Sequence, residues 1–234
     1  MTYGSTPALR SIGPDIWIAD RRLSLAVGDI GARMTVIRLP TQGLFVHSPV
    51  LPDEATRNAL NELGPVVAVV APNKTHHFFV RRFHAVFPTA QYWAAPGLRQ
   101  KRRDIPFDHT LGDEAPTLWS AHIQQCHVRG IPLLEEVVFF HVPSKTLILT
   151  DLAFNFPLNR SVDWRAKLFL RLNGAMGRFG PHRLLRMLIR DRQAFAQSIR
   201  RILAWDFDAV VVSHGDLLTT GAKQAVYQAF ARWL

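Results

Sequence analysis

The chain has 234 residues, of which 48% are hydrophobic and 20% charged, so it can bury a large core and is too poor in charge for a disordered protein. Its single cysteine, Cys126, excludes an internal disulfide and a cysteine-rich zinc module. The longest aliphatic run, residues 66–71, is far shorter than the roughly 20 residues of a membrane span, and residues 1–5 lack the features of a secretory signal. We therefore expect a single domain over residues 1–234, located in the cytoplasm, either free or peripheral to a membrane.

The net charge of +10 is concentrated in one part of the chain. Between residues 160 and 205, eleven basic residues stand against Asp163 and Asp191, which gives this segment a charge of +9. The rest of the chain is close to neutral. Such an asymmetry predicts an anionic partner for one face of the molecule.

The first half of the chain is predicted to form short strands and helices around one central strand. Strands are expected at 16–18, 24–27, 34–39 and 44–46. Asp53 as N-cap and Gly64 as terminator predict a helix between them, and the apolar run that follows is typical of a buried strand at 66–70. A helix over 78–86 and a strand at 91–94 come next. Residues 97–116 are polar, basic and contain proline, so we expect a surface loop there.

In the second half, strands are expected at 118–128, 136–142 and 146–150, and the last two form a hairpin. Helical spacing over 163–204, interrupted at 174–181, predicts two helices. A final strand at 209–212 and a closing helix over about 221–233 complete the chain.

Candidate functional residues follow directly after three of the predicted strands. His76 and His77 follow the first, Asp151 the second and His214 the third. The ends of strands are where α/β proteins collect their sites, and three imidazoles with one carboxylate suit Zn²⁺, Fe²⁺ or Mn²⁺. Each residue alone also has a structural explanation, as a polar helix start or a turn cap.

The order of the elements and three short motifs resemble the metallo-β-lactamase superfamily. The motifs Val46-His47-Ser48-Pro49, Ala71-Pro72-Asn73-Lys74-Thr75-His76-His77 and Ser213-His214-Gly215 are similar to a branch known only as a domain of unknown function. The resemblance covers roughly residues 10–155 and 203–234. It implies an α/β fold, a four-layer αββα sandwich with metals at one edge of the two sheets, and makes the basic segment a helical insertion at about 156–204.

The resemblance also implies which metal ligands are present. The superfamily's first motif reads Thr-His-x-His-x-Asp-His, and here Pro72 and Lys74 stand at its first two histidines. Pro132 stands where another histidine of the first metal is expected, about nineteen residues before the hairpin aspartate. All three first-metal histidines are thus replaced. The second site keeps a counterpart for each ligand, namely His76, His77, Asp151 and His214. The implied cofactor is one divalent transition metal, with zinc preferred to iron or manganese.

Several neighbouring residues have open roles. Lys74 would hold a substrate anion or stabilise oxyanion charge, or else point to solvent. Glu135 and Glu136 would reach the site as ligand or base, or form a solvated strand end. Ser48 stands where the superfamily often has an aspartate, and His47 beside it would orient a ligand through its second ring nitrogen. The remaining histidines have no companion at ligand spacing and are expected to be surface or structural: His84, His109, His122, His127, His141 and His182.

We expect a mononuclear metal-dependent hydrolase that acts on an ester, thioester, lactone or amide, with Lys74 and Asp151 as catalytic residues. Four protein ligands leave no vacancy on a tetrahedral ion, so turnover would need five-coordination or Asp151 acting as base. The alternatives are a mononuclear iron oxidoreductase and a non-catalytic member that binds a membrane or nucleic acid through its basic helices. The chain lacks a Gly-x-Ser-x-Gly elbow and a phosphate loop, and Cys126 lies on a predicted strand away from the candidate residues, which disfavours a serine or cysteine hydrolase.

The basic segment predicts helices with one apolar face and one arginine-rich face. Such helices either pack on the core or form an interfacial lid that lies on anionic lipid and delivers a small acyl or lipid-like substrate to the metal. Arginines outnumber lysine ten to one, which would also suit RNA phosphates, but no aromatic stacking platform interleaves with them. Anionic membrane is therefore favoured over nucleic acid as a partner.

Overall fold

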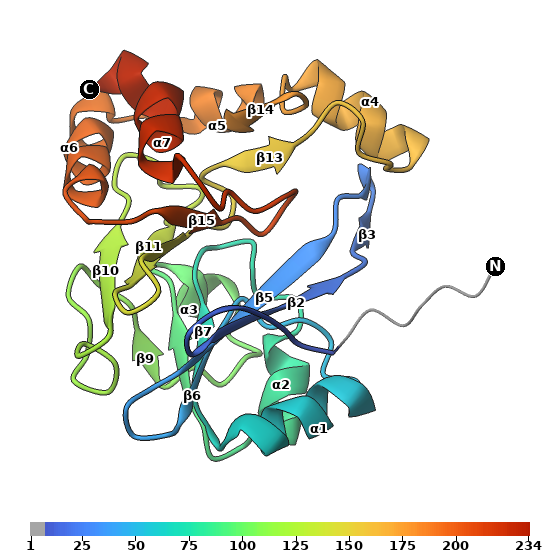
Figure 1. Ribbon diagram of the computed structural model, residues 1–234, viewed down its shortest axis with the longest axis vertical. Coiled ribbons are helices and arrows are strands. Elements are labelled where there is room, and N and C mark those ends of the chain that lie inside the picture. The colour runs from blue at the N-terminus through green and yellow to red at the C-terminus, as the bar shows by residue number, and fades with distance from the viewer. Residues whose placement is uncertain (1–7) are drawn as a thin grey trace.

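A computed structural model describes residues 8–234 and shows an α/β molecule (Figure 1). Residues 1–5, which carry the expectation that no secretory signal is present, lie outside the described residues. Within residues 8–234, no helix is both long and apolar enough to cross a membrane. The elements of the first half are β1 (Arg10–Gly13), β2 (Ile16–Arg21), β3 (Ser24–Leu25), β4 (Gly28–Asp29), β5 (Ala32–Arg38), β6 (Leu44–His47), α1 (Glu54–Leu63), β7 (Val66–Ala71), α2 (Val80–Val86), β8 (Gln91–Ala94), α3 (Leu98–Lys101) and β9 (His109–Thr110).

The second half holds more helix. Its elements are β10 (Ile123–His127), β11 (Val137–His141), β12 (Thr146–Ile148), β13 (Phe154–Phe156), α4 (Trp164–Leu172), β14 (Arg178–Gly180), α5 (Arg183–Leu188), α6 (Arg192–Leu203), β15 (Ala209–Val211), α7 (Ala222–Phe230) and a closing 3₁₀ turn (Ala231–Trp233). The predicted hairpin is confirmed, because β11 and β12 pair antiparallel.

Two sheets pack face to face between two helical layers. The larger has the strand order β1-β2-β5-β6-β7-β8-β9, and the smaller has the order β10-β11-β12-β15. Apolar side chains from both sheets meet between them, where the Phe45 ring lies 5.1 Å from the centroid of Trp119 and 5.4 Å from that of Phe139. The expected four-layer αββα sandwich is confirmed.

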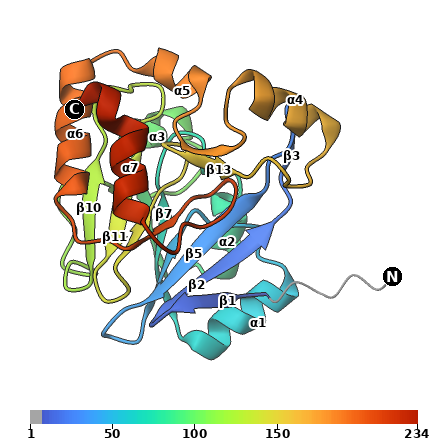
Figure 2. The same cartoon turned by 45° about the horizontal axis from the view of Figure 1, so that its top comes forward.

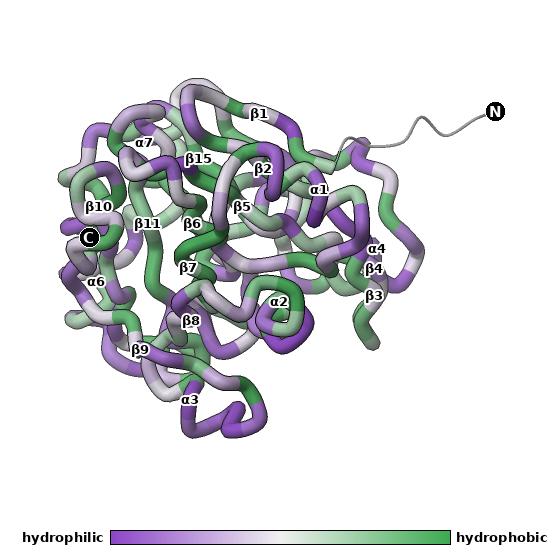
Figure 3. Tube along the Cα trace, turned by 90° about the horizontal axis from the view of Figure 1, so that it is seen from below, coloured by the Kyte–Doolittle hydropathy of each residue, from purple (hydrophilic) through white to green (hydrophobic). Residues whose placement is uncertain are grey.

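The outer faces of the sheets are covered by different helices. Leu60 of α1 and Phe83 of α2 pack on the larger sheet, whereas Phe195 of α6 and Phe230 of α7 pack on the smaller one. Figure 2 shows α6 and α7 beside β10 and β11. Hydropathy follows this layering: β6 and β7 are hydrophobic strands inside the molecule, and α3 at its periphery is largely hydrophilic (Figure 3).

Helix α1 illustrates how the sequence sets an element's ends. The Asp53 carboxylate accepts the N–H of Thr56 at 2.8 Å, which satisfies an amide that has no partner within the first turn. Gly64 ends the helix with φ 146°, and a Cβ at this position would meet the Gln42 carbonyl oxygen at 2.5 Å. Both predicted ends of this helix are confirmed.

Two sequence expectations are wrong. Residues 97–116 are not simply a surface loop, because α3 forms there, β9 extends the larger sheet, and Leu98, Phe107 and Leu111 are buried. Isolated apolar residues in a polar stretch show no periodicity, so this burial left no pattern to detect. The basic segment forms three helices instead of two, since Asp191 accepts the N–H of Ala194 at 2.9 Å and starts α6 as a new helix.

Candidate metal centre

Three of the predicted ligands converge at the ends of their strands. The Nε2 atoms of His76 and His214 lie 3.3 Å apart. His76 Nε2 is 3.4 Å from Asp151 Oδ2, and His214 Nε2 is 3.4 Å from Asp151 Oδ1. Among the described residues these three form a group of possible metal-ligating side chains whose ligand atoms all lie within 4.8 Å of one another.

The loop after β7 presents His76 through a turn organised by Asn73. The buried Asn73 carboxamide oxygen accepts the N–H groups of Thr75 and His76, both at 2.8 Å. An asparagine that bonds backbone two and three residues ahead fixes a tight turn without regular structure. His76 Nδ1 pairs with the Ser48 hydroxyl at 2.7 Å, and Ser48 holds this position in a left-handed conformation with φ 53°. The Nε2 atom is thereby directed toward the other two ligands.

Asp151 is held from two sides. Asn73 donates to Asp151 Oδ2 at 2.9 Å, and the Thr75 hydroxyl donates to the same oxygen. Burial would raise the pKa of Asp151, but the imidazoles of His76 and His214 outweigh that effect and hold it well below its ordinary value. The carboxylate is therefore ionised and available as a ligand.

Glu136 shapes the backbone from which Asp151 projects. It is fully buried, and its carboxylate accepts the N–H groups of Thr150, Asp151 and Leu152 at 2.8, 2.8 and 3.0 Å. Burial and the charge of Asp151 raise the pKa of Glu136 to about 7. The expectation of a solvated strand end is wrong for Glu136, because its acceptors are used by a turn of the backbone. Glu135 points elsewhere and pairs with His127 at 2.6 Å.

His214 is fixed by contacts with the larger sheet. Its Nδ1 donates to the carbonyl of Gly31 at 2.9 Å, which fixes the ring with Nε2 directed toward the other two residues. Buried Arg33 donates to the carbonyls of Val212 and Gly215 on either side of the histidine. Gly215 has φ 103°, and a Cβ there would overlap the backbone of Asn155.

The ligand atoms of the three residues lie close enough together for a small divalent ion. A tetrahedral ion with bonds of about 2.0–2.1 Å to nitrogen or oxygen has ligands about 3.3–3.4 Å apart. The two Nε2 atoms, 3.3 Å apart, match this edge length, and each lies 3.4 Å from a different oxygen of the Asp151 carboxylate. Two imidazole nitrogens and a carboxylate are also ligands that zinc, iron and manganese accept. The residues therefore have the chemistry and the proximity to hold such an ion, which His76, Asp151 and His214 would bind together.

His77 and Lys74 lie outside this group. His77 is buried and its Nδ1 accepts from Arg102 at 2.6 Å, while burial and then the Arg102 charge lower its pKa to about 4. The turn at Asn73 sends the side chains of neighbouring histidines in different directions. Lys74 Nζ donates to the carbonyl of Pro132 at 2.7 Å. Lys74 and Pro132 stand at two positions where the resemblance places first-metal histidines. A hydrogen bond from the lysine ammonium to the proline carbonyl joins them.

An apolar pocket of about 390 Å³ opens above the three ligands. Its walls come from the β3 hairpin, the start of α2 and the basic helical segment, and include Leu23, Leu25, Val27, Phe78, Phe79, Phe154, Phe169, Leu185 and Leu188. His182, which was expected to be surface or structural, also lines this pocket. Its Nδ1 accepts the N–H of Leu185 at 3.2 Å, so the neutral ring carries its proton on Nε2.

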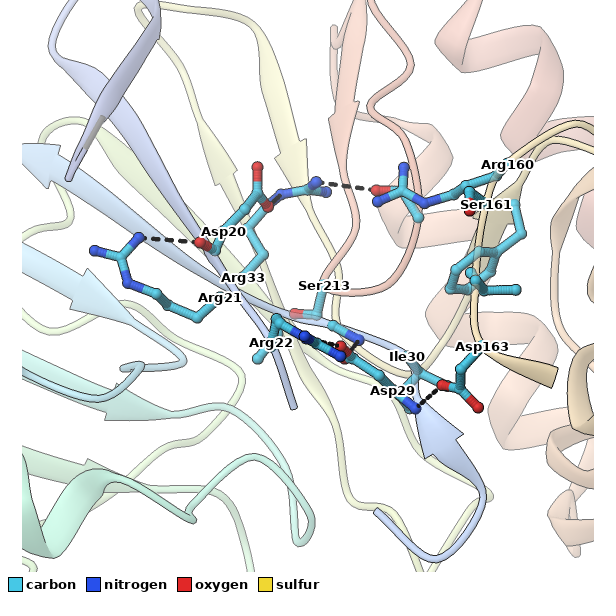
Figure 4. Close-up of a pocket in the computed structure, with 15 residues that line it drawn as sticks. Asp20, Arg21, Arg22, Asp29, Ile30, Arg33, Arg160, Ser161, Asp163 and Ser213 are labelled. Carbon is cyan, nitrogen blue, oxygen red and sulfur yellow. Dashed lines mark hydrogen bonds and ion pairs between the residues drawn. The ribbon is translucent and has the colours of Figure 1, made fainter. Parts of the chain in front are cut away.

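A second hollow, of about 540 Å³, lies beside the pocket and is lined by charged residues (Figure 4). Arg22 pairs with Asp29 at 2.7 Å, and Arg33 pairs with Asp20 at 2.7 Å. Arg160 pairs with Asp216. Ile30 and Ala32 line both hollows, so the backbone between β4 and β5 separates a charged cleft from the apolar pocket.

Sequence reasoning missed four residues that build the site: Asn73, Glu136 in its actual role, Ser48 as the partner of His76, and Arg33. Asn73 had a detectable signal, because Pro-Asn-x-Thr is typical of a turn in which asparagine bonds its own backbone. Arg33 had none, since it contacts residues about 180 positions away. His47 does not orient a ligand: both of its ring nitrogens are buried without a partner.

Comparisons with known proteins agree with this geometry. Residues 14–161 match the model of the family described as "Domain of unknown function (DUF4336)". No curated protein matches the sequence. Among solved structures, the chain is similar to DIM-1 metallo-beta-lactamase exposed to ceftazidime, at 14% identity and TM-score 0.65 over 96% of each chain. It is also similar to a metallo beta lactamase from Erythrobacter litoralis, at 13% identity and TM-score 0.67 over 96% of each chain.

A third similar structure is the Flv1 flavodiiron core from Synechocystis sp. PCC6803, at 13% identity and TM-score 0.65, covering 96% of this chain and 60% of that one. At these identities the similarity establishes the fold. The expected metallo-β-lactamase-like architecture is therefore confirmed.

Proposed function

This chain belongs to the DUF4336 family, and from its site we propose that it is a mononuclear metal-dependent hydrolase of an ester, thioester, lactone or amide that carries an apolar group. The observation that carries the proposal is the triangle of His76, Asp151 and His214 at the base of an apolar pocket. When bound, a divalent ion supplies Lewis-acid chemistry: it lowers the pKa of a water molecule toward 7 and polarises a carbonyl. With three protein ligands, a tetrahedral ion keeps a vacancy that four ligands would fill.

The protein's own residues prepare the site for this chemistry. Ser48 and the Gly31 carbonyl fix the two imidazole rings, so no reorientation is needed when the ion arrives. Asn73 and Thr75 occupy one carboxylate oxygen of Asp151 with hydrogen bonds. Because these supports hold the ligands in one arrangement, the geometry is set before substrate binds.

The pocket selects the substrate. Its aromatic and aliphatic walls exclude water and favour a substrate with an aliphatic or aromatic group beside the scissile carbonyl. His182 is placed on the same wall with a ring N–H to donate, and we propose that it binds a polar atom of the substrate. His182 and part of the pocket wall both come from the basic helical segment. This segment therefore contributes to the choice of substrate.

Hydrolysis of p-nitrophenyl esters with acyl chains of two to twelve carbons tests the proposal. Protein reconstituted with zinc should turn over, protein treated with a chelator should not, and kcat/KM should rise with chain length by up to about fourfold for each methylene that enters the pocket. His214→Ala should abolish the metal-dependent rate. The matched control, His109→Ala, changes an exposed histidine outside the site and should retain it.

Absence of metal-dependent turnover with esters, thioesters, lactones and amides would contradict the hydrolase proposal. Metal binding without turnover would then indicate a non-catalytic member of the fold. Bound iron together with oxygen consumption would indicate an oxidoreductase.

A further inference from the structure

Exposed apolar side chains are concentrated on the basic helical segment. Of the eleven large hydrophobic residues that are exposed in the described part of the chain, six lie within residues 158–187: Leu158, Trp164, Leu168, Leu172, Leu184 and Met187. An apolar surface of this kind on a monomer marks an interaction site more often than isolated exposed residues do. The segment therefore requires a partner that accepts apolar side chains.

On α4 these residues form one stripe. Trp164, Leu168 and Leu172 are spaced by four residues, which places them on one side of the helix, and they are 70%, 51% and 64% exposed. The side that packs on the protein is formed by Ala166 and Leu170. The apolar face that the sequence predicts for α4 is therefore exposed, and the helix packs on the protein through a second apolar side.

Cationic side chains border the stripe. At 100° per residue, Arg165 falls beside Leu172 on one margin and Arg171 beside Trp164 on the other. The Arg165 guanidinium lies 5.4 Å from the Trp164 ring centre. Within residues 8–234, neither arginine forms an ion pair with an acidic side chain. Of the eleven basic residues between positions 160 and 205, only Arg160 and Arg201 do so.

A hollow lined by arginines adjoins α5. Its polar lining consists of Arg183, Arg186, Arg192 and Arg232, without an acidic residue, and Met187 and Ile189 complete it. Burial and then the positive charges of Arg178, Arg232 and Arg183 lower the pKa of Arg186. Four cations collected in this way repel one another, and an anion placed among them relieves that repulsion.

The two helices form one continuous surface. The backbone N–H of Arg183 donates to the carbonyl of Asn173 at 2.8 Å, which joins the start of α5 to the end of α4. Figures 1 and 2 place both helices along the same edge of the molecule. Leu184 is exposed on this edge and also lines the pocket above the metal ligands. The surface therefore borders the entrance of the pocket.

We propose that the exposed faces of α4 and α5 dock on an anionic phospholipid bilayer. Tryptophan and leucine side chains insert into the boundary between headgroups and acyl chains, and the flanking arginines remain at the level of the phosphates. The arginine-lined hollow receives a lipid phosphate. An RNA partner would leave the apolar stripe without a match, whereas an anionic bilayer offers acyl chains to the stripe and phosphates to the arginines.

Sedimentation of the full chain with vesicles tests this docking. Vesicles of phosphatidylcholine with about a third phosphatidylglycerol should carry the protein down, and vesicles of phosphatidylcholine alone should not. Raising the salt from about 50 mM to 500 mM should weaken the association, because the Debye length shortens several-fold. Inorganic phosphate should displace the protein no better than chloride of equal ionic strength, since the site is selective for the bilayer.

Two sets of variants separate the contributions. Trp164→Ser, Leu168→Ser and Leu172→Ser together should reduce vesicle partitioning at least tenfold. The matched control Leu51→Ser, Val142→Ser and Tyr227→Ser changes exposed apolar residues elsewhere and should leave partitioning unchanged. Arg165→Gln with Arg171→Gln should reduce partitioning by about 25-fold, because each arginine near the surface contributes about a factor of five. Its control is Arg99→Gln with Arg103→Gln, which changes two exposed arginines outside α4 and α5.

Equal sedimentation with anionic and neutral vesicles, or with neither, would overturn the proposal. So would partitioning that the serine and glutamine variants leave unchanged. A wild-type dimer that the serine variant converts to a monomer would show that the surface joins two copies of the chain. Tighter association with single-stranded RNA than with anionic vesicles would show a nucleic-acid surface. None of these results depends on turnover at the metal site.

Discussion

The two hollows on either side of the backbone between β4 and β5 differ in how their polar groups are satisfied. In the charged cleft, arginine and aspartate side chains pair with each other, as Arg22 does with Asp29 and Arg33 with Asp20. In the apolar pocket, the Nε2 atoms of His76 and His214 have, among residues 8–234, only each other and the two oxygens of Asp151 as partners. The cleft is therefore satisfied by its own ion pairs, whereas the base of the pocket offers ligands for the cation that we propose.

This contrast shows why the larger and more charged hollow is not the better candidate site. Buried polar groups in folded proteins nearly always have hydrogen-bond partners, so two imidazoles and a carboxylate gathered at the base of an apolar pocket are a better candidate for a ligand site than side chains that already pair with each other. The charged cleft instead supports the pocket structurally. Arg33 lines the cleft, and its guanidinium donates hydrogen bonds to the loop that carries His214.

The largest expected effect comes from removing a ligand at the base of the pocket. His214→Ala should reduce metal affinity by well over a hundredfold, because two remaining ligands cannot hold the ion. His77→Ala is the matched control: its side chain pairs with Arg102 outside the ligand group and should leave metal content at the wild-type level. Metal analysis of both variants by mass spectrometry checks the prediction, and loss of metal from the His77 variant would restore His77 to the ligand set.

The next effect tests the support that the cleft gives to the pocket. Arg33→Met should lower the free energy of unfolding by about 2–3 kcal/mol, because it leaves two backbone carbonyls and Asp20 without their donor. It should also weaken metal binding by about tenfold through displacement of His214. Arg33→Lys, which keeps the charge and one donor, should recover part of both. Unchanged metal affinity in Arg33→Met would show that the loop holds His214 without the arginine.

A smaller effect is expected at Lys74. Lys74→Met removes the hydrogen bond to the Pro132 carbonyl and should lower stability by about 1 kcal/mol with metal content unchanged. Since Lys74 does not line the pocket, we expect less than a tenfold loss in kcat/KM. Loss of metal from this variant would mean that the lysine positions the adjacent ligand loop.

The smallest effect is expected at the outer rim of the charged cleft. Arg22 is 87% exposed, so its ion pair with Asp29 is strongly screened by solvent. Arg22→Gln should therefore change stability by less than about 1 kcal/mol and leave metal affinity and turnover unchanged. A large loss of turnover would show that the cleft takes part in substrate binding, and would break the distinction between the two hollows.

Whether a feature could be predicted from the sequence depends on how far apart in the chain the residues that determine it lie. The ends of α1 were predictable because Asp53 and Gly64 act within a few residues. The convergence of His76, Asp151 and His214 was predictable because each follows a strand whose end lies at the same edge of the sandwich. The direction of His77 was not predictable, because it depends on the turn that Asn73 makes.

Contacts between distant segments left no local pattern. Ser48 meets His76 across neighbouring strands, Glu136 binds the turn that precedes Asp151, and Arg33 reaches the far end of the chain. The exposure of Trp164 could not be predicted either. A helix with apolar residues on both sides shows the same spacing of apolar residues as a helix that buries them all. Such features require the folded backbone before they can be seen.

Elemental analysis tests the proposed metal centre most directly. The full chain is purified without a metal-affinity tag and titrated with zinc after chelation. The triangle of His76, Asp151 and His214 predicts one tightly bound transition-metal ion per chain, reduced to less than a tenth in Asp151→Ala. Two ions per chain would show that a metal binds at the first site although Lys74 and Pro132 stand in place of its histidines. No bound ion at micromolar zinc would contradict the central claim that these three side chains form a metal centre.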